Sequence, residues 1–286
     1  MDEIIITERT IDVENVFRTK NPGLFKWIPG FVFGYLRRVI HEKEINEFLY
    51  RNRSEKGLDF VDAIIEGFGV NVEVKGEENI PESGRYIVAS NHPLGGLDGV
   101  ALMHVFGRKR KDIVFPVNDL LMFLPNLREL FIPINKHGSN SENLEIINKT
   151  FESDKMVLYF PAGLVSRKQK GKITDLEWKK TIISKAKQYN RDIIPVHIEG
   201  RNSMFFYNLA NFRKKIKIRA NLEMLYLPDE MYKQKNKTIS ITIGLPIPYQ
   251  MFDNRFNYGE WAEKVKQHVY KIGAGLSDQI FMVFHP

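Results

Sequence analysis

The stretch Ser90-Asn91-His92-Pro93-Leu94-Gly95-Gly96-Leu97-Asp98-Gly99 joins an apolar run, residues 85–89, to a helix-like run, residues 100–106. Its Asn-His pair lies where a strand should end, and its Asp lies where a helix should begin. Histidine can act as a general base near neutral pH, and a nearby carboxylate can orient its ring. We therefore predict that His92 and Asp98 form a catalytic pair and that the rest of the chain supports this turn.

The composition is that of an ordinary globular protein. The chain has 286 residues, of which 43% are hydrophobic and 27% charged, enough for one large or two ordinary domains. The absence of cysteine excludes disulfides, thiolate zinc sites and a cysteine nucleophile. The net charge of +7 indicates an anionic partner, such as a membrane surface, nucleic acid or an acidic protein, unless it merely solvates the surface.

The first 57 residues differ from the rest. They lack the features of a signal peptide, and no window of about 18 uninterrupted apolar residues predicts a transmembrane helix. Residues 21–50 carry a dense aromatic and apolar cluster between Leu24 and Leu36, which Lys26 interrupts and Arg37 and Arg38 follow. This segment could lie in a membrane interface or form a buried helical hairpin that covers the core. We expect a peripheral protein on the cytoplasmic face of the inner membrane.

From residue 58 onward an α/β pattern predicts a single α/β domain, residues 58–286, with a mostly parallel central sheet flanked by helices. Residues 1–57 form its N-terminal arm and helical membrane-contact region. The predicted strands are 70–74, 85–90, 113–117, 131–135, 155–160, 193–198, 216–227 and 238–245. The predicted helices are 58–70, 98–107, 119–124, 142–152, 175–189 and 260–272.

The carboxyl ends of the predicted strands gather polar residues. In open α/β sheets, ligands bind beyond these ends. The segments that follow the strands are residues 91–98, 136–138, 161–168 and 199–203, which together supply the His-Asp pair, several cations and glycine-rich turns. Such an edge suits an anionic or acyl substrate.

Other chemistries have weaker support. A Gly-x-Ser-x-Gly elbow is absent, so Ser166 and Ser203 are nucleophile candidates only by their proximity to glycine. No motif fixes a metal-ligand spacing among the histidines and carboxylates. Nucleic-acid binding would rest on charge alone, without an aromatic-basic platform or a helix-turn-helix pattern.

Several of these segments together resemble the motif blocks of glycerolipid acyltransferases of the lysophosphatidic acid acyltransferase superfamily. The resemblance runs from about residue 70 to 205 and rests on Asn91-His92-Pro93 with Asp98, Phe131 to Lys136, Phe160-Pro161-Ala162-Gly163, and Ile194-Pro195-Val196. It implies transfer of an acyl chain from an acyl carrier protein or coenzyme A thioester to a lyso-lipid hydroxyl at a membrane surface. It implies no metal and no cofactor beyond that co-substrate. An acidic carrier protein would be attracted to a chain of net charge +7.

Three departures from the family pattern bear on the acceptor. Five residues rather than four separate His92 from Asp98, and the extra residue falls in a flexible glycine pair. In the third block, Ala162 and Val165 replace the Glu and Arg that belong to the family's acceptor site, where the Arg faces a phosphate. The second block ends in Lys136 instead of Arg. These changes disfavour a glycerol-phosphate acceptor and resemble a branch that acylates lyso-aminolipids such as lyso-ornithine or lyso-glycine lipid.

The resemblance assigns roles to particular residues. His92 would act as the base and Asp98 as its orienting carboxylate, while amides around Gly163 would face the oxyanion. Arg167, Lys168 or Lys136 would receive the acceptor's carboxylate or phosphate. The full set of substrate-binding candidates is Asn91, Gly95, Gly96, Lys136, Pro161, Gly163, Ser166, Arg167 and Lys168. Alternatives are a 1-acylglycerol-3-phosphate acyltransferase, a non-catalytic lipid-binding relative, and a lipase or thioesterase.

Overall fold

The computed structural model describes residues 10–20, 22–118, 121–134, 141–276 and 281. Its α-helices are α1 (Val13–Lys20), α2 (Pro22–Phe25), α3 (Gly30–Ile40), α4 (Glu42–Arg51), α5 (Gly57–Phe68), α6 (Gly96–Lys109), α7 (Ser141–Glu152), α8 (Thr181–Gln188), α9 (Met204–Lys215), α10 (Leu227–Tyr232) and α11 (Tyr258–Gly273). Its strands are β1 (Asn71–Lys75), β2 (Tyr86–Ser90), β3 (Ile113–Val117), β4 (Phe131–Pro133), β5 (Met156–Tyr159), β6 (Arg167–Gln169), β7 (Lys172–Thr174), β8 (Asp192–Ile198) and β9 (Thr238–Ile243). Short 3-10 helices are η1 (Glu77–Asn79), η2 (Leu121–Phe123), η3 (Pro125–Leu130), η4 (Leu222–Tyr226) and η5 (Tyr249–Met251).

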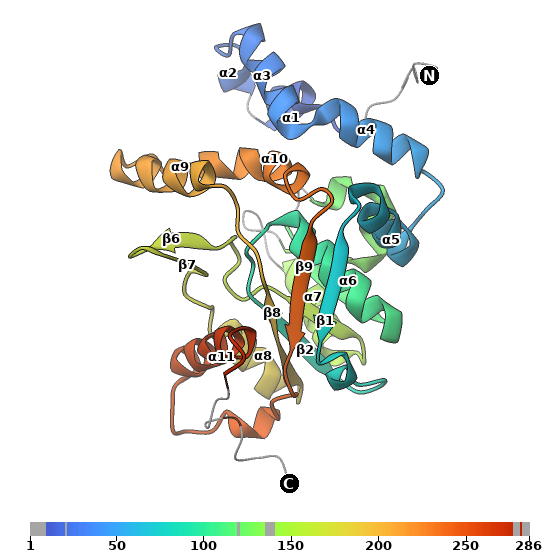
Figure 1. Ribbon diagram of the computed structural model, residues 1–286, viewed down its shortest axis with the longest axis vertical. Helices are drawn as coiled ribbons and strands as arrows, with labels where there is room; N and C mark the ends of the chain where they lie inside the picture. Colours follow the sequence, from blue (N-terminus) through green and yellow to red (C-terminus); the bar gives the residue numbers. More distant parts are fainter. Residues whose placement is uncertain (1–9, 21, 119–120, 135–140, 277–280, 282–286) are drawn as a thin grey trace.

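Seven of the described strands form one sheet in the order β1-β9-β8-β2-β5-β3-β4 (Figure 1). The strands β8, β2, β5, β3 and β4 run parallel, β9 pairs antiparallel with β8, and β1 pairs parallel with β9. The predicted α/β class with a mostly parallel central sheet is therefore confirmed. The strands β6 and β7 form a separate antiparallel hairpin.

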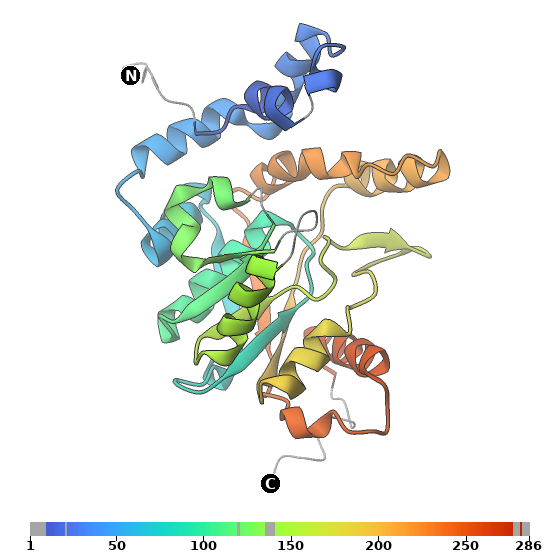
Figure 2. The same cartoon turned by 180° about the vertical axis from the view of Figure 1, so that it is seen from behind.

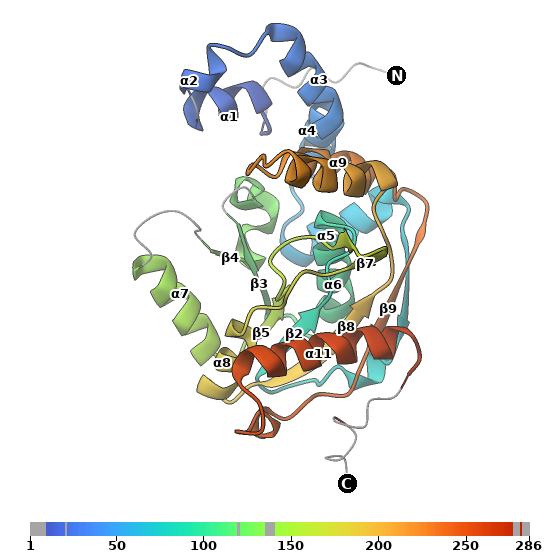
Figure 3. The ribbon, with the colours of Figure 1, turned by 90° about the vertical axis from the view of Figure 1, so that its left-hand side faces the viewer.

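Apolar residues alternate between the two faces of the sheet because successive strand residues point to opposite sides. Val88 of β2 packs in the cluster that includes α5 and α6, whereas Ile87 and Ala89 pack in the cluster that includes α8 and α11. Both faces are thus covered by helices, which Figure 3 shows with α11 and α8 on one side and α5 and α6 on the other.

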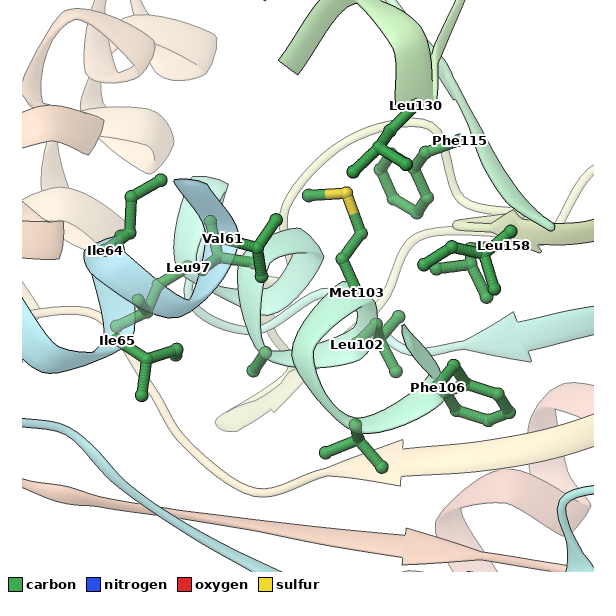
Figure 4. Close-up of a cluster of buried hydrophobic side chains, with 14 of the residues drawn as sticks. Val61, Ile64, Ile65, Leu97, Leu102, Met103, Phe106, Phe115, Leu130 and Leu158 are labelled. Atoms are coloured by element: carbon green, nitrogen blue, oxygen red, sulfur yellow. The ribbon is translucent and has the colours of Figure 1, made fainter. Parts of the chain in front are cut away.

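The central helix α6 is buried along most of its length. Every residue from Leu97 to Gly107 is buried, as expected for a helix that is apolar on all sides. Met103 and Phe106 lie among side chains of α5, β3 and β5 (Figure 4). Because α6 begins at the turn quoted above, its packing fixes the position of Asp98.

The carboxyl ends of the five parallel strands face a layer made of α9 and α10, and the helices α1–α4 lie beyond that layer (Figures 1 and 2). The Tyr35 hydroxyl of α3 lies 2.8 Å from the Tyr226 hydroxyl of η4. The His41 ring, between α3 and α4, stacks on Tyr232 at 3.9 Å. The N-terminal helices are therefore attached on the side of the sheet where the candidate residues gather.

Residues 21–50 combine buried and exposed apolar side chains. Phe33 and Leu36 are buried in a small cluster, while Trp27 and Phe31 are 85% and 78% exposed. The segment thus covers part of the protein and also presents aromatic side chains outward. Within the described ranges, no helix is long and apolar enough to cross a bilayer. The division at residue 57 and the membrane contact stay predictions.

Three predicted elements differ from the structure. The strand predicted at 216–227 is wrong, because these residues form an exposed turn, η4 and the start of α10. The helix predicted from residue 175 begins only at Thr181, because residues 175–180 form a loop in which Asp175 and Trp178 are buried. Helix α9 was not predicted. The predicted helix at 119–124 is described only as the 3-10 helix η2, and its first two residues lie outside the described part.

Candidate active site

The side chains of His92 and Asp98 meet, as predicted, and their catalytic role stays a prediction. His92 follows β2, in the middle of the sheet between β8 and β5, and its Nδ1 lies 2.8 Å from Oδ2 of Asp98. An ionised carboxylate only accepts hydrogen bonds, so the proton of a neutral imidazole lies on Nδ1 and Nε2 keeps its lone pair. The His92 side chain is 16% exposed and that of Asp98 is 0% exposed. Nε2 of His92 is therefore the atom available to act as a base.

The extra residue between His92 and Asp98 is taken up by a turn around the carboxylate. Gly95 has φ = 89°, a conformation that favours glycine. The amides of Leu94 and Gly95 donate to the same Asp98 Oδ2, at 2.8 and 3.0 Å. Gly96 then begins α6. Both glycines thus shape the loop that lets Asp98 reach His92.

Opposing effects act on the Asp98 carboxyl group. Burial raises its pKa, and the hydrogen bonds from His92, Leu94 and Gly95 lower it part of the way back. Asp98 also lies in the first turn of α6, where the helix dipole favours a negative charge. The turn therefore supplies the donors that support a buried carboxylate next to His92.

The imidazole and the backbone of His92 are held by Phe160 and Ser166 of the third motif block, residues 160–166, and by Asp175. The ring stacks on Phe160, with centroids 3.9 Å apart and planes 14° apart. The His92 carbonyl accepts the amide hydrogen of Ser166 at 2.7 Å. The amide of His92 donates to Oδ1 of Asp175 at 3.2 Å. These contacts hold the ring without occupying Nε2.

Asp175 joins several segments to the turn at residues 92–98, here called the catalytic turn because it carries the proposed pair, and the sequence patterns did not indicate this role. It is fully buried and accepts hydrogen bonds from the Ser166 hydroxyl at 2.5 Å and from Trp178 Nε1 at 2.9 Å. Its own amide donates to the Tyr270 hydroxyl at 2.8 Å. Burial raises the pKa of Tyr270 to about 12, which keeps this phenol neutral. The pattern had placed Asp175 at a helix start, where an exposed cap is the usual interpretation.

Two of the substrate-binding candidates, Asn91 and Ser166, have hydrogen-bond partners within the protein. Asn91 is 2% exposed and exchanges two hydrogen bonds, 2.8 and 2.7 Å long, with the backbone of Ile198. Ser166 is 1% exposed and bonds Asp175. These side chains fasten β2 to β8 and the third block to the catalytic turn, so the structure gives them positioning roles.

Arg167 is also committed within the protein. It is 2% exposed, and its guanidinium donates to Glu223 at 2.9 Å and to the Val165 carbonyl at 2.5 Å. It therefore does not present a free cation to an acceptor. Lys168 follows it on β6 and is half-buried, and Lys136 lies outside the described residues.

The turn after β5 brings an unpredicted cation to the third block. Gly163 has φ = 65°, and its amide donates to the Phe160 carbonyl at 3.0 Å, so this amide is not free for an oxyanion. The Pro161 carbonyl accepts the Lys179 amide hydrogen at 3.1 Å. A Cβ added to Gly163 would lie 3.0 Å from Nζ of Lys179, which places that exposed ammonium over the glycine. Lys179 does not directly follow a strand, so a search of the segments after the predicted strands could not find it.

In this site a histidine pairs with an aspartate at the carboxyl end of a central parallel strand, and a residue of a Phe-Pro-x-Gly turn packs against the histidine ring. This is the arrangement expected of an acyltransferase. A family model described as "Acyltransferase" matches residues 15–278. The chain belongs to this acyltransferase family, and the predicted enzyme class is confirmed.

Two relatives and one solved structure were also found to be similar to this chain. A lyso-glycine lipid O-acyltransferase of Bacteroides thetaiotaomicron is 50% identical over 92% of this chain and 97% of the relative. The enzyme of the same name from Phocaeicola vulgatus is 48% identical over 92% and 95%. Both relatives support the resemblance to the aminolipid branch. The structure of the 1-acyl-sn-glycerophosphate acyltransferase PlsC from Thermotoga maritima is 17% identical with a TM-score of 0.45, covering 87% of this chain and 95% of that one.

Proposed function

We propose that this protein transfers a fatty acyl chain from an acyl thioester to the hydroxyl group of a lyso-glycine lipid. The observation that carries the proposal is the His92–Asp98 pair, set in a chain 50% identical to an enzyme named for that reaction. The loss of the family's acceptor-site Glu and Arg at Ala162 and Val165 agrees with an acceptor other than a glycerol phosphate.

The geometry supports a general-base mechanism. Nε2 of His92 takes the proton of the acceptor hydroxyl as its oxygen attacks the thioester carbonyl, and Asp98 stabilises the imidazolium. When the tetrahedral intermediate collapses, the carbon–sulfur bond breaks and the imidazolium returns the proton to the leaving thiolate. General-base assistance of this kind contributes about 10²- to 10⁴-fold. Because the Gly163 amide is used in its turn, the oxyanion donors would be neighbouring amides of the same loop.

The acceptor carboxylate and the membrane need cationic and apolar groups. With Arg167 paired to Glu223, the cations left for the carboxylate are Lys179, Lys168 and Lys136. The exposed Trp27 and Phe31 would contact the cytoplasmic face of the inner membrane. A carrier-protein and a coenzyme A thioester are both anionic, and a protein of net charge +7 would attract either.

The first experiment compares His92→Ala with wild type, using both thioester donors and a panel of lyso-lipids. We expect the variant to lose at least about 10²-fold in kcat. His104→Ala is the matched control, because His104 also bonds an aspartate, Asp62, at 2.6 Å but lies on α6 away from the strand end. Full turnover by His92→Ala would refute the mechanism. Acylation of lysophosphatidic acid in preference to lyso-glycine lipid would refute the acceptor, and free fatty acid without acceptor would indicate a thioesterase.

A further inference from the structure

The segment from Phe212 to Leu222, here called the α9–η4 tip, exposes apolar side chains that the catalytic site does not use. Every residue from Lys214 to Leu222 is exposed. The exposed fractions of the large apolar side chains are 59% for Phe212, 47% for Ile216, 38% for Ile218 and 39% for Leu222. Isolated exposed apolar residues are common, but a cluster on one projecting turn marks an interaction surface.

The charges of the tip all have one sign. Four exposed cations alternate with the apolar residues, namely Lys214, Lys215, Lys217 and Arg219, and no acidic residue occurs from Met204 to Leu222. Within the described part of the chain none of these four forms an ion pair. A surface that interleaves cations with apolar groups fits an interface in which the cations meet anionic headgroups and the apolar groups enter the acyl boundary.

A buried ion network holds the tip in place. Glu223, which is fully buried, accepts hydrogen bonds from Arg213 at 2.5 and 2.9 Å and from Arg167 at 2.9 Å. Arg213 also donates to the Ile218 carbonyl at 3.2 Å. The exposed turn is thus tied through Glu223 to Arg167, one residue after the Ser166 that contacts the catalytic turn. Such satisfied buried pairs define geometry more than they add stability.

The tip ends at Leu222 in η4, and Tyr226 of the same 3-10 helix contacts α3. Figures 1 and 2 show that the tip projects past the sheet on the side where α2 and α3 lie. The Tyr226 hydroxyl lies 2.8 Å from the Tyr35 hydroxyl of α3, and the Tyr226 ring packs edge-on against Phe205 at the start of α9, with ring centroids 5.0 Å apart. Tyr35 is 50% exposed and lies one helical turn from the exposed Phe31. The exposed aromatic residues of α3 therefore lie next to the 3-10 helix that follows the tip.

We propose that the α9–η4 tip is a second membrane-docking element, which inserts its apolar side chains into an anionic lipid bilayer. This inference rests on the proposed function only in that the acceptor is a lipid drawn from such a surface. The tip and the N-terminal helices both lie on the side of the sheet where the parallel strands end. Docking through both would therefore direct these strand ends, and His92 with them, toward the bilayer. The ion network through Glu223 would fix the position of the tip relative to the loop of the third motif block.

The absence of cysteine from the sequence allows a direct test with single-cysteine variants of the full-length protein. Ile218→Cys carries an environment-sensitive fluorophore, and Ile146→Cys on α7, at a 44% exposed site, is the matched control. With vesicles of phosphatidylcholine and phosphatidylglycerol, we expect a blue shift at position 218 and none at 146. Vesicle binding without a shift at 218, or an equal shift at both positions, would overturn the proposal.

Vesicle flotation then measures the contribution of the tip. We expect Ile216→Ser/Ile218→Ser to weaken binding at least about tenfold, and Lys214→Gln/Lys217→Gln to weaken binding to anionic vesicles by about fivefold for each charge removed. The controls are Ile146→Ser/Leu245→Ser, and Arg108→Gln/Lys109→Gln at the far end of α6. Unchanged binding by both tip variants would refute the proposal.

Turnover of detergent-dispersed substrate separates the two proposals. If the tip variants keep wild-type turnover in detergent but bind vesicles weakly, docking and catalysis are distinct, as proposed. If neither the wild type nor the variants transfer acyl chains while the vesicle results are as expected, the proposed reaction fails and the docking surface stands. If the wild type transfers acyl chains but its vesicle binding does not depend on the tip, the docking surface fails alone.

Discussion

Asp98 accepts three hydrogen bonds on one oxygen, from Nδ1 of His92 at 2.8 Å and from the amides of Leu94 and Gly95. This geometry is reached although five residues separate His92 from Asp98, because the Gly95 turn wraps around the carboxylate. The pair therefore depends on the turn as much as on the two side chains.

Asp98→Asn should remove the orienting charge while preserving shape. An amide cannot support the Nδ1-protonated tautomer and an imidazolium in the same way, so we expect kcat to fall about 10²- to 10⁴-fold with a smaller change in KM. Asp62→Asn is the matched control, since it alters the His104 pair in the same manner. Steady-state kinetics with saturating donor would measure both. Equal losses in the two variants would argue against a catalytic role for Asp98.

Substitution of Asp175 tests its positioning role. Asp175→Asn places an amide donor among groups that donate to the carboxylate, so we expect the free energy of unfolding to fall by about 1–3 kcal/mol and kcat to fall with little change in KM. Ser166→Ala should cost about 1 kcal/mol of stability in the same manner. Urea unfolding and kinetics would be compared with Ser184→Ala, whose half-buried hydroxyl donates to the Thr181 carbonyl and to no other group among the described residues. A raised acceptor KM with unchanged stability in Ser166→Ala would restore its role as a substrate ligand.

The regular parts of the fold followed from local patterns. Alternating apolar strands and helices predict the parallel sheet because each strand must be buried on both faces. The motif spacing likewise predicts the meeting of His92 and Asp98 at the end of β2. These features depend on residues close in sequence or on the common edge that parallel strands share.

The errors came from long-range contacts. Ile216 and Ile218 alternate with cations and so suggest a strand, but Arg213 and Glu223 hold this segment in an exposed turn. Arg167 looked like a free cation because its partner, Glu223, is 56 residues away. Helix α9 did leave a local signal, since the Ser203 hydroxyl caps it by accepting the Phe206 amide hydrogen at 3.3 Å.

Gly200→Ala should disturb the catalytic turn through Leu94. Gly200 has φ = 152°, and an added Cβ would lie 2.8 Å from Leu94 Cδ2. Because the Leu94 amide donates to Asp98, we expect a loss of stability of about 1–3 kcal/mol and a lower kcat. Gly171→Ala is the control: its φ is 82°, but an added Cβ would meet nothing within 4 Å. Thermal unfolding and kinetics would separate the clash from backbone strain, and equal effects would contradict the clash.

Lys179→Gln tests whether this cation receives the acceptor carboxylate. A hydrogen bond to a charged group is worth about 1.5–3 kcal/mol, so we expect acceptor KM to rise about tenfold or more with little change in donor KM or kcat. The neighbouring exposed Lys180, changed to Gln, is the matched control for loss of a surface charge. Both are measured at varied lyso-glycine lipid concentration. An unchanged acceptor KM in Lys179→Gln would direct the assignment to Lys168 or Lys136.

His197 should make stability fall on acidification. Burial lowers the pKa of its imidazole below the usual 6.5, although Glu199 and Asp175 act in the opposite direction. The folded protein thus binds this proton less tightly than the unfolded chain, so the contribution of His197 is fully present above pH 6.5 and is lost as pH falls through its folded pKa. We expect the free energy of unfolding of His197→Gln, measured in urea and compared with that of wild type, to rise relative to wild type as the pH falls from 7.5 to 5.5. Parallel pH profiles would show that another group controls acid stability.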